Sequence, residues 1–248
     1  MRLEGKTVIV TGAGGGMGRA IVKKLLEEGA KVGGIDLKQA SMEELDHDRF
    51  TPFEADILDE EAIAGVFRDM HEKNGRIDGL VNAAGIAQPA TPITDVSVSE
   101  WHRLMDVNAT SLFITSREAA RYMKDAKSGS IITIASVSAV RPRPGLQSYI
   151  ASKGAAESFT RALAIELAED NVRVNTIHPG PADTQMLAKF TAKDADVSET
   201  RESIFASSVP LGRLIQPEDI SGGVVYLLSD DASMVTGTTL RIDGGRGL

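Results

Sequence analysis

Runs of mostly apolar residues alternate with amphipathic stretches along nearly the whole chain of 248 residues. The short apolar runs predict buried strands at residues 7–12, at a segment that ends at Asp36, and at 51–55, 77–82, 130–136, 172–177 and 238–242. The amphipathic stretches predict helices over residues 17–28, 59–73, 99–124, 148–169 and 217–228. Strands that alternate with helices predict an α/β fold in which helices cover both faces of a parallel sheet. Because no repeat or linker interrupts the alternation, we expect one domain over residues 1–248.

Two segments depart from this pattern. Residues 185–209 contain two possible short helices and a polar centre, KDADVSETRE, but no strand pattern. An insertion of this length in a compact domain is usually a functional lid or a mobile loop, and we expect a lid over a substrate. Gly33 and Gly34 weaken the second strand, and we expect them where another backbone or a ligand comes close.

Composition narrows the class of protein. The net charge of −8 disfavours binding to nucleic acid or to an anionic membrane, because both attract basic surfaces. The chain has no cysteine, and its four histidines lack metal-ligand spacing, so we expect neither a disulfide nor a bound metal. No apolar run is long enough to span a bilayer, and MRLEGK leads into the first strand without a signal-peptide core. The expected location is therefore the cytoplasm.

A glycine-rich loop, TGAGGGMG, joins the first strand to the first helix. Gly12, Gly16 and Gly18 in this loop permit a tight turn, let a pyrophosphate approach bare backbone amides, and let the helix pack closely on the strand. A loop that is merely flexible is the alternative, and the position directly after the first strand favours a dinucleotide site.

Asp36 ends the second strand, about 20 residues beyond the loop, where a carboxylate can accept hydrogen bonds from the adenosine ribose. A carboxylate there repels a 2′-phosphate, so NAD is favoured over NADP, although Lys38 leaves NADP open and Asp36 could simply cap the next helix. Small residues at 82–85, Asn-Ala-Ala-Gly, leave room for a cofactor at the end of the fourth strand, or form an ordinary turn.

Tyr149 and Lys153 lie four residues apart in a predicted helix and therefore share one face. A neighbouring ammonium and a nicotinium charge together lower the pKa of a phenol, so this tyrosine could exchange a proton with an alcohol or a ketone. Ser136, at the end of a strand, could hydrogen-bond the same oxygen, and Ser138 is its rival. A solvated helix face and a structural turn serine are the alternatives.

These motifs together resemble the short-chain dehydrogenases/reductases, and the resemblance covers practically the whole chain: TGAGGGMG, Asp36, NAAG, Asn108, Ser136, YIASK, HPGPADT and MVTGTTLRIDGG. The resemblance implies a Rossmann fold with a doubly wound seven-stranded parallel sheet in the order 3-2-1-4-5-6-7. It also implies a catalytic tetrad. Tyr149 would be the acid/base, Ser136 would polarise the substrate oxygen, Lys153 would bind the nicotinamide ribose, and Asn108 would hold a water in a proton relay.

The family pattern further implies the residues that bind the cofactor. Asp56 would meet adenine, and the backbone after Pro179 and Gly180, with Thr184, would hold the carboxamide. The implied set comprises Gly12, Gly14, Gly15, Gly16, Met17, Gly18, Asp36, Leu37, Asp56, Ile57, Asn82, Ala83, Ala84, Gly85, Tyr149, Lys153, Pro179, Gly180, Ala182 and Thr184. The chain has NAAG where the family often has NNAG, and we interpret His178 as a satisfied structural histidine.

The substrate is predicted less sharply than the chemistry. The loop after the fifth strand, the segment after NAAG and the lid would wall the pocket, with Ser138, Arg143, Gln88 and Met186 as candidate contacts. Arg141 or Arg143 could bind an anionic group of the substrate, because guanidinium groups bind such groups in bidentate fashion. Solvated loop arginines are the alternative.

The sequence thus predicts an NAD-dependent oxidoreductase that acts on a secondary alcohol or ketone, with the oxidative direction mildly favoured. An NADP-linked carbonyl reductase, or a regulatory or scaffold protein that binds a dinucleotide without turnover, is the alternative. The family's dimer helices correspond to residues 99–124 and the helix of Tyr149, which carry extra apolar residues such as Phe113, Ile114, Phe159 and Leu163. We therefore expect a homotetramer, a dimer of dimers.

Overall fold

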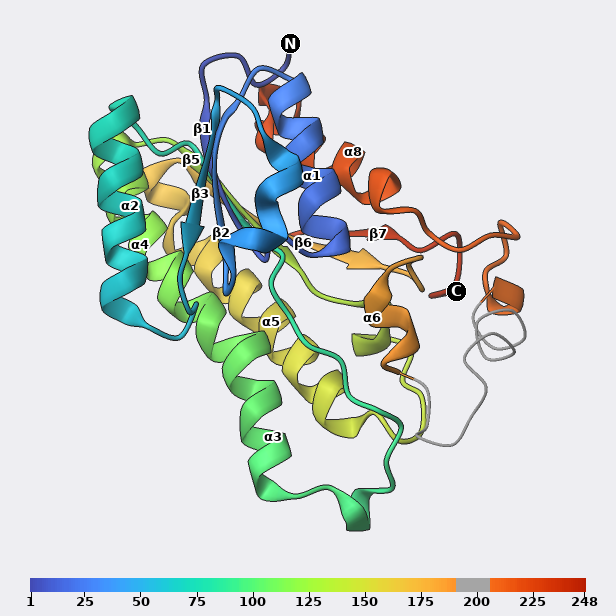
Figure 1. Ribbon diagram of the computed structural model, residues 1–248. Coiled ribbons are helices and arrows are strands. Elements are labelled where there is room, and N and C mark those ends of the chain that lie inside the picture. The colour runs from blue at the N-terminus through green and yellow to red at the C-terminus, as the bar shows by residue number, and fades with distance from the viewer. Residues whose placement is uncertain (191–205) are drawn as a thin grey trace.

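One seven-stranded parallel sheet runs through the protein in the computed structural model, which describes residues 1–190 and 206–248 (Figure 1). The strand order, β3-β2-β1-β4-β5-β6-β7, is the order predicted. The strands are β1 (Thr7–Thr11), β2 (Lys31–Asp36), β3 (Phe50–Glu54), β4 (Gly79–Asn82), β5 (Gly129–Ile134), β6 (Val172–Pro179) and β7 (Thr239–Ile242). The order reverses direction between β1 and β4, and this switch point is where open α/β sheets bind ligands.

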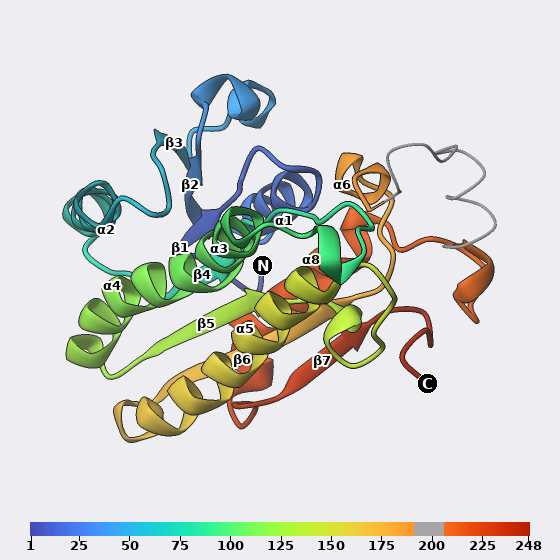
Figure 2. The same ribbon diagram turned by 90° about the horizontal axis from the view of Figure 1, so that it is seen from below.

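Helices cover both faces of the sheet, as Figure 2 shows. The helices are α1 (Gly16–Glu27), α2 (Glu60–Asn74), α3 (Val98–Met105), α4 (Ser111–Ala126), α5 (Gln147–Glu166), α6 (Gln185–Ala188) and α8 (Pro217–Leu228). Successive residues of β1 point to opposite faces, so Val8 and Val10 pack with α1 and α8 while Ile9 packs with α2, α4 and α5. The strands are therefore apolar on both sides, as a doubly covered sheet requires.

The helix predicted over residues 99–124 differs from the structure. It is divided into α3 and α4 by a π-helical turn at Asp106–Thr110, which contains Asn108. The segment DVNAT at residues 106–110 contains neither glycine nor proline, so the residues that usually mark the end of a helix in a sequence are absent. Because π turns occur often at functional sites, this turn marks Asn108 independently of any motif.

The two glycines of β2, Gly33 and Gly34, lie close to core side chains and not to the ligand or backbone that the sequence led us to expect. A Cβ at Gly33 would lie 3.0 Å from Cγ of Met70, and a Cβ at Gly34 would lie 2.7 Å from Cε2 of Phe50. Side chains of α2 and β3, and not a ligand or another backbone, occupy this space. The expectation of a ligand here is wrong, because the glycines make room for core packing.

The expected lid is described only in part. Its first residues form α6, and Ala206–Ser208 form a 3₁₀ turn, whereas residues 191–205 lie outside the described part. Within the described ranges no helix is long and apolar enough to cross a membrane.

Candidate active site

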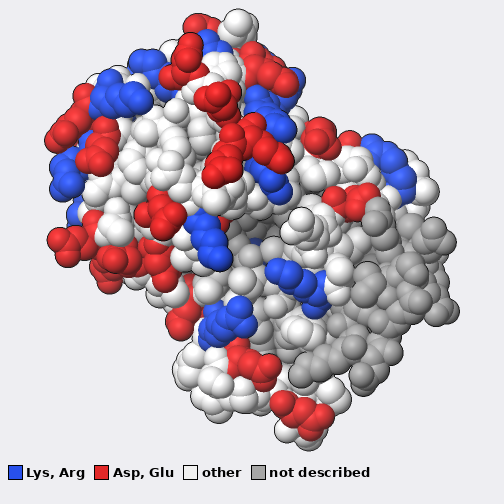
Figure 3. Space-filling model, in the orientation of Figure 1, with Lys and Arg blue, Asp and Glu red and all other residues white. Residues whose placement is uncertain are grey.

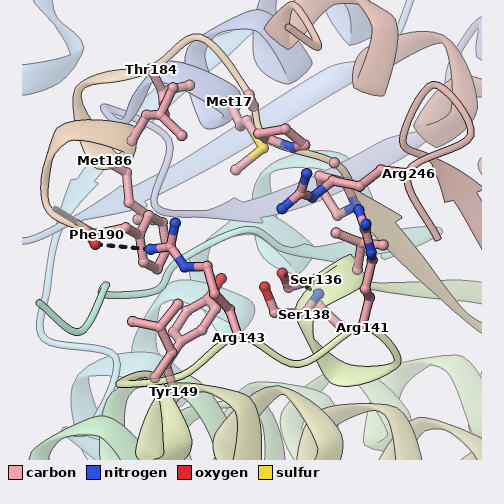
Figure 4. A pocket seen from close by; sticks show the side chains of 18 residues that line it. Met17, Ser136, Ser138, Arg141, Arg143, Tyr149, Thr184, Met186, Phe190 and Arg246 are labelled. Carbon is pink, nitrogen blue, oxygen red and sulfur yellow. Dashed lines mark hydrogen bonds between the residues drawn. The ribbon is translucent and has the colours of Figure 1, made fainter. Parts of the chain in front are cut away.

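Two adjoining pockets lie at the carboxyl ends of the strands. A groove of about 410 Å³ follows the glycine loop, the end of β2 and residues 83–86. A second pocket lies beside Tyr149 (Figure 4), and the two share Met17, Thr184 and Met186 in their walls. Figure 3 shows a hollow near the centre of the face seen in Figure 1. A long ligand in the groove could therefore present one end to a smaller molecule in the second pocket.

The glycine loop is shaped as a dinucleotide requires. Gly12 has a φ of 66°, and a Cβ there would lie 2.7 Å from Cα of Ala84, so only glycine fits. A Cβ at Gly18 would lie 2.0 Å from the carbonyl oxygen of Gly12, which explains the close packing of α1 on the loop. The first turn of α1 contains no acidic residue, and its amide groups face the groove where a pyrophosphate would bind.

The Asp36 carboxylate lies in the groove wall and is held by two backbone amides. Oδ2 accepts a hydrogen bond from the amide of Gly14 at 2.9 Å, and Oδ1 accepts one from the amide of Leu37 at 2.8 Å. These bonds fix the orientation of the carboxylate, and each oxygen keeps a lone pair for a further donor. The negative charge therefore stands in a fixed position at the end of β2.

Tyr149, Lys153 and Ser136 come together where α5 crosses the end of β5. Tyr149 and Lys153 are 5% and 6% exposed, and the Ser136 hydroxyl lies beside the Tyr149 phenol in the same pocket wall. The Lys153 ammonium lies 6.0 Å from the centre of the Tyr149 ring and donates a hydrogen bond to the Ile134 carbonyl at 3.0 Å. A hydroxyl, a phenol and an ammonium thus occupy one water-poor site.

Burial is the main cause of the pKa shifts of Tyr149 and Lys153. It raises the pKa of Tyr149 to about 12, and the hydrogen bond with Ser136 opposes that rise. Burial also lowers the pKa of Lys153 to about 8. In the chain alone, removal of water therefore dominates the pKa of Tyr149, and the lowering expected from the ammonium together with a nicotinium charge stays a prediction.

Asn108 connects the π turn to the same site. Its Oδ1 accepts a hydrogen bond from the amide of Ile86 at 2.8 Å, and its Nδ2 donates to the Ile86 carbonyl and to Ser152 Oγ at 3.1 and 3.0 Å. A Cβ at Gly85 would lie 3.1 Å from Oδ1 of Asn108 and 3.3 Å from Nζ of Lys153. Asn108 therefore ties the segment after β4 to α5 and faces the same point as Lys153.

The structure brings most of the implied cofactor residues together. Those that line the groove or the adjoining pocket are Gly12, Gly15, Gly16, Met17, Gly18, Asp36, Leu37, Asp56, Ile57, Ala83, Ala84, Gly85, Tyr149, Pro179, Gly180, Ala182 and Thr184. Gly14, Asn82 and Lys153 do not line either pocket. Asn82 points into the core, where its side chain bonds to the hydroxyls of Thr115 and Ser116 at 2.8 and 3.2 Å.

Of the candidate substrate contacts, Ser138, Arg143 and Met186 line the second pocket and Gln88 does not. Gln88 is 4% exposed, and its Oε1 accepts a hydrogen bond from the backbone amide of Tyr149 at 2.9 Å. It therefore acts on the site indirectly, by satisfying an amide in the first turn of α5. Phe190 also lines the pocket, with its ring centre 4.9 Å from that of Tyr149 in an edge-to-face contact.

Several wall residues carry no signal in the sequence. Arg103 of α3 and Lys189 after α6 line the groove, and Arg246, two residues from the C-terminus, lines the second pocket. Isolated basic residues are ordinary on a surface, so only the folded chain shows that these three face a pocket.

His178 is structural, but the expectation that its hydrogen bonds are satisfied is wrong. The ring is 0% exposed, and neither nitrogen has a hydrogen-bond partner within the described residues. Nε2 lies 3.5 Å from Oε2 of Glu157, and burial lowers the pKa of the ring. The imidazole is therefore held neutral in the core.

Comparisons with known proteins agree with this geometry. A family model described as enoyl-(acyl carrier protein) reductase matches residues 12–246. The chain is 34% identical over 252 residues to 2,3-dihydro-2,3-dihydroxybenzoate dehydrogenase of Bacillus subtilis, with 98% of this chain and 96% of the relative covered. Its structure resembles 3-ketoacyl-(acyl-carrier-protein) reductase from Brucella melitensis complexed with NADH, at a TM-score of 0.92, 34% identity and coverage of 99% and 100%. It also resembles NAD⁺-bound xylitol dehydrogenase, at a TM-score of 0.91, 30% identity and coverage of 99% and 100%. The chain belongs to the short-chain dehydrogenase/reductase family.

Proposed function

We propose that this oxidoreductase interconverts a secondary alcohol and a ketone with NAD as cofactor and Tyr149 as the acid/base. One observation carries the proposal: Tyr149 and Ser136 lie side by side in the pocket that adjoins the glycine-loop groove. When bound, the nicotinamide accepts a hydride from the carbinol carbon or donates one to the carbonyl carbon. The residues of the chain must then hold the substrate oxygen and move its proton.

Tyr149 and Ser136 share that task. Ser136 Oγ already accepts a hydrogen bond from the amide of Ser138 at 3.1 Å, so its own proton is available to a substrate oxygen. In ketone reduction the phenol of Tyr149 gives its proton to the oxygen that becomes a hydroxyl, and in alcohol oxidation the phenolate takes that proton back. With a pKa near 12 the phenol is in the acid form at neutral pH. Oxidation therefore requires added positive charge beside the ring, which Lys153 and an oxidised nicotinamide would supply together.

Asp36 supports NAD as the cofactor. Its fixed carboxylate would accept hydrogen bonds from ribose hydroxyls and repel a 2′-phosphate. Lys38, which left NADP open in the sequence, does not line the groove. The two similar structures with NADH and NAD⁺ agree with this preference.

The kind of substrate is suggested by the relatives. Their names specify a cyclic dihydrodiol acid, a 3-ketoacyl group and a polyol, which share an oxidisable hydroxyl or a reducible ketone. We extend only that shared feature to this chain.

The assembly and the location remain predictions. Phe113 on α4 and Ile165 on α5 are 48% and 81% exposed, which supports an apolar contact between protomers along these helices, whereas Ile114 is buried in the core. The homotetramer is testable by light scattering, and the cytoplasmic location by fractionation of the source cells. The closure of residues 185–209 over a substrate also stays a proposal.

A panel of secondary alcohols, polyols, hydroxysteroids and hydroxy acids tests the function, with NAD and NADP compared at equal concentration. We expect a rise in nicotinamide absorbance with NAD for at least one member of the panel. Calorimetry of NAD binding is run beside it. A protein that binds NAD but turns over no member in either direction would be a dinucleotide-binding regulatory protein, and a faster rate with NADP would overturn the cofactor assignment.

A further inference from the structure

Three arginines converge on the pocket that contains Tyr149. Arg141 and Arg143 follow β5, and Arg246 follows β7, about a hundred residues further along the chain. Figure 4 shows Arg141 and Arg246 on one side of the pocket and Arg143 on the other, with Ser136 between them. None of the three lines the glycine-loop groove, so their charges belong to the substrate side.

Hydrogen bonds and close packing fix the backbone on both sides of Arg246. Asp243 accepts hydrogen bonds from the amides of Gly245 and Gly247, at 2.9 and 2.8 Å, and so closes a tight turn around Arg246. Gly245 has a φ of 87°, and a Cβ at Gly247 would lie 3.3 Å from Cγ2 of Val137, beside the catalytic serine. The turn is therefore packed against the segment that carries Ser136, and the Arg246 guanidinium donates a hydrogen bond to the Ser208 carbonyl at 3.4 Å.

Arg141 and Arg246 form no salt bridge with an acidic side chain within residues 1–190 and 206–248. Asp243, the carboxylate nearest in sequence to Arg246, accepts hydrogen bonds from backbone amides of the turn with both of its oxygens. Burial lowers the pKa of Arg246, the charges of Arg141 and Arg143 lower it further, and the charge of Asp243 opposes this shift.

Positive charges held close together repel each other, and an anionic ligand bound between them would relieve this repulsion. Guanidinium groups remain protonated in proteins, so the chain cannot relieve the repulsion by losing a proton. An anion placed between Arg141 and Arg246 would receive charge-assisted hydrogen bonds from both in a partly desolvated site. The pocket lining also includes the apolar residues Leu146, Met186 and Phe190.

We infer that the substrate carries an anionic group, held by Arg141 and Arg246, while Ser136 and Tyr149 hold the oxygen that is oxidised or reduced. The chemical class is therefore a hydroxy or keto acid, sulfonate or phosphate whose charged group is separated from the reacting carbon by an apolar body. This inference rests on the proposed function. Arg143, whose Nη2 donates to the Phe190 carbonyl at 3.0 Å, forms the facing wall.

Matched substrates and matched variants test the inference. 4-Hydroxycyclohexanecarboxylate, the corresponding sulfonate and the corresponding phosphate are compared with neutral 4-methylcyclohexanol, all with NAD. In Arg246→Met and Arg141→Met we expect KM for the preferred anion to rise at least tenfold, and the ratio of kcat/KM for this anion to kcat/KM for the neutral alcohol to fall at least tenfold. Arg241→Met removes the same charge from an exposed residue of β7 outside the pocket, and we expect both substrates to be unaffected. The three anions distinguish a carboxylate site from a sulfonate or phosphate site.

A binding measurement separates this inference from the proposed function. Cyclohexanecarboxylate, cyclohexanesulfonate and cyclohexyl phosphate are titrated by calorimetry into the wild type and Arg246→Met in the presence of NAD. We expect at least one of these anions to bind the wild type at least tenfold more tightly than it binds Arg246→Met. Turnover in which the ratio of kcat/KM for the anionic substrates to kcat/KM for the neutral alcohol is the same in the wild type and in both variants would overturn the anion site and leave the proposed function intact. Anion binding that depends on Arg246, without any turnover, would overturn the proposed function and support the anion site. Circular dichroism and the neutral-alcohol rate verify that each variant is folded.

Discussion

Replacement of Lys153 by Met should make the protein more stable at neutral pH while removing its activity. Burial lowers the lysine pKa from 10.5 to about 8, a difference of 10.5 − 8 = about 2.5 pKa units. At about 1.4 kcal/mol per unit, the charged ammonium therefore costs the folded state roughly 3 kcal/mol at pH 7. The methionine keeps most of the apolar stem and loses the hydrogen bond to the Ile134 carbonyl, worth about 1 kcal/mol. The expected net gain in the free energy of unfolding is about 2 kcal/mol.

The pH dependence of this gain has a fixed sign. The folded pKa lies below the unfolded pKa, so the penalty is largest below pH 8 and shrinks as the pH rises toward 10.5. Urea unfolding at pH 6, 7 and 9, at one protein concentration, should show a gain that falls to about 1 kcal/mol at pH 9. Lys23→Met, an exposed position of α1, is the control and should change stability little at any pH. A less stable Lys153→Met at pH 7, or a gain that grows between pH 7 and 9, would refute the reasoning.

Three further outcomes are expected. Gly12→Ala should lose NAD binding and about 2 kcal/mol of the free energy of unfolding, because Gly12 has a positive φ and lies close to the backbone of Ala84. The control Gly222→Ala, at an exposed position of α8, should raise the free energy of unfolding in urea by about 0.5–1 kcal/mol. Asp36→Ser should raise the ratio of kcat/KM for NADP to that for NAD by about tenfold or more, and an unchanged ratio would remove Asp36 as the determinant. In cofactor-free protein at pH 10.5, the wild type and Tyr149→Phe should show equal phenolate absorbance, because the raised pKa keeps Tyr149 protonated until the pH approaches 12; extra absorbance in the wild type would contradict this.

The strands and the covered parallel sheet were predictable because their cause is local, whereas the strand order was implied by the family resemblance. Each buried strand is an apolar run, as in β1, and alternation with helices permits only a covered parallel sheet. The glycine loop was predictable for the same reason, since Gly12 and Gly18 are required by backbone geometry that any dinucleotide site shares.

Features that depend on distant packing were not predictable. The π turn at Asn108 contains neither glycine nor proline, so the sequence shows no break. Asn82 and Gln88 are polar side chains near the site that fold away from it, because Thr115 and the first turn of α5 need hydrogen-bond partners. Arg246 reaches the pocket only because β7 lies beside β6.

The central claim is that Tyr149 moves the proton in a hydride transfer, and one variant tests it most directly. Tyr149→Phe keeps the ring and its contact with Phe190 but has no acidic hydroxyl. The rate of NADH formation on the best alcohol is measured together with the dissociation constant of NAD. We expect kcat to fall by about 10²–10⁴-fold, as for loss of a general acid/base, with NAD binding within about twofold of the wild type. Full turnover by Tyr149→Phe would contradict the mechanism.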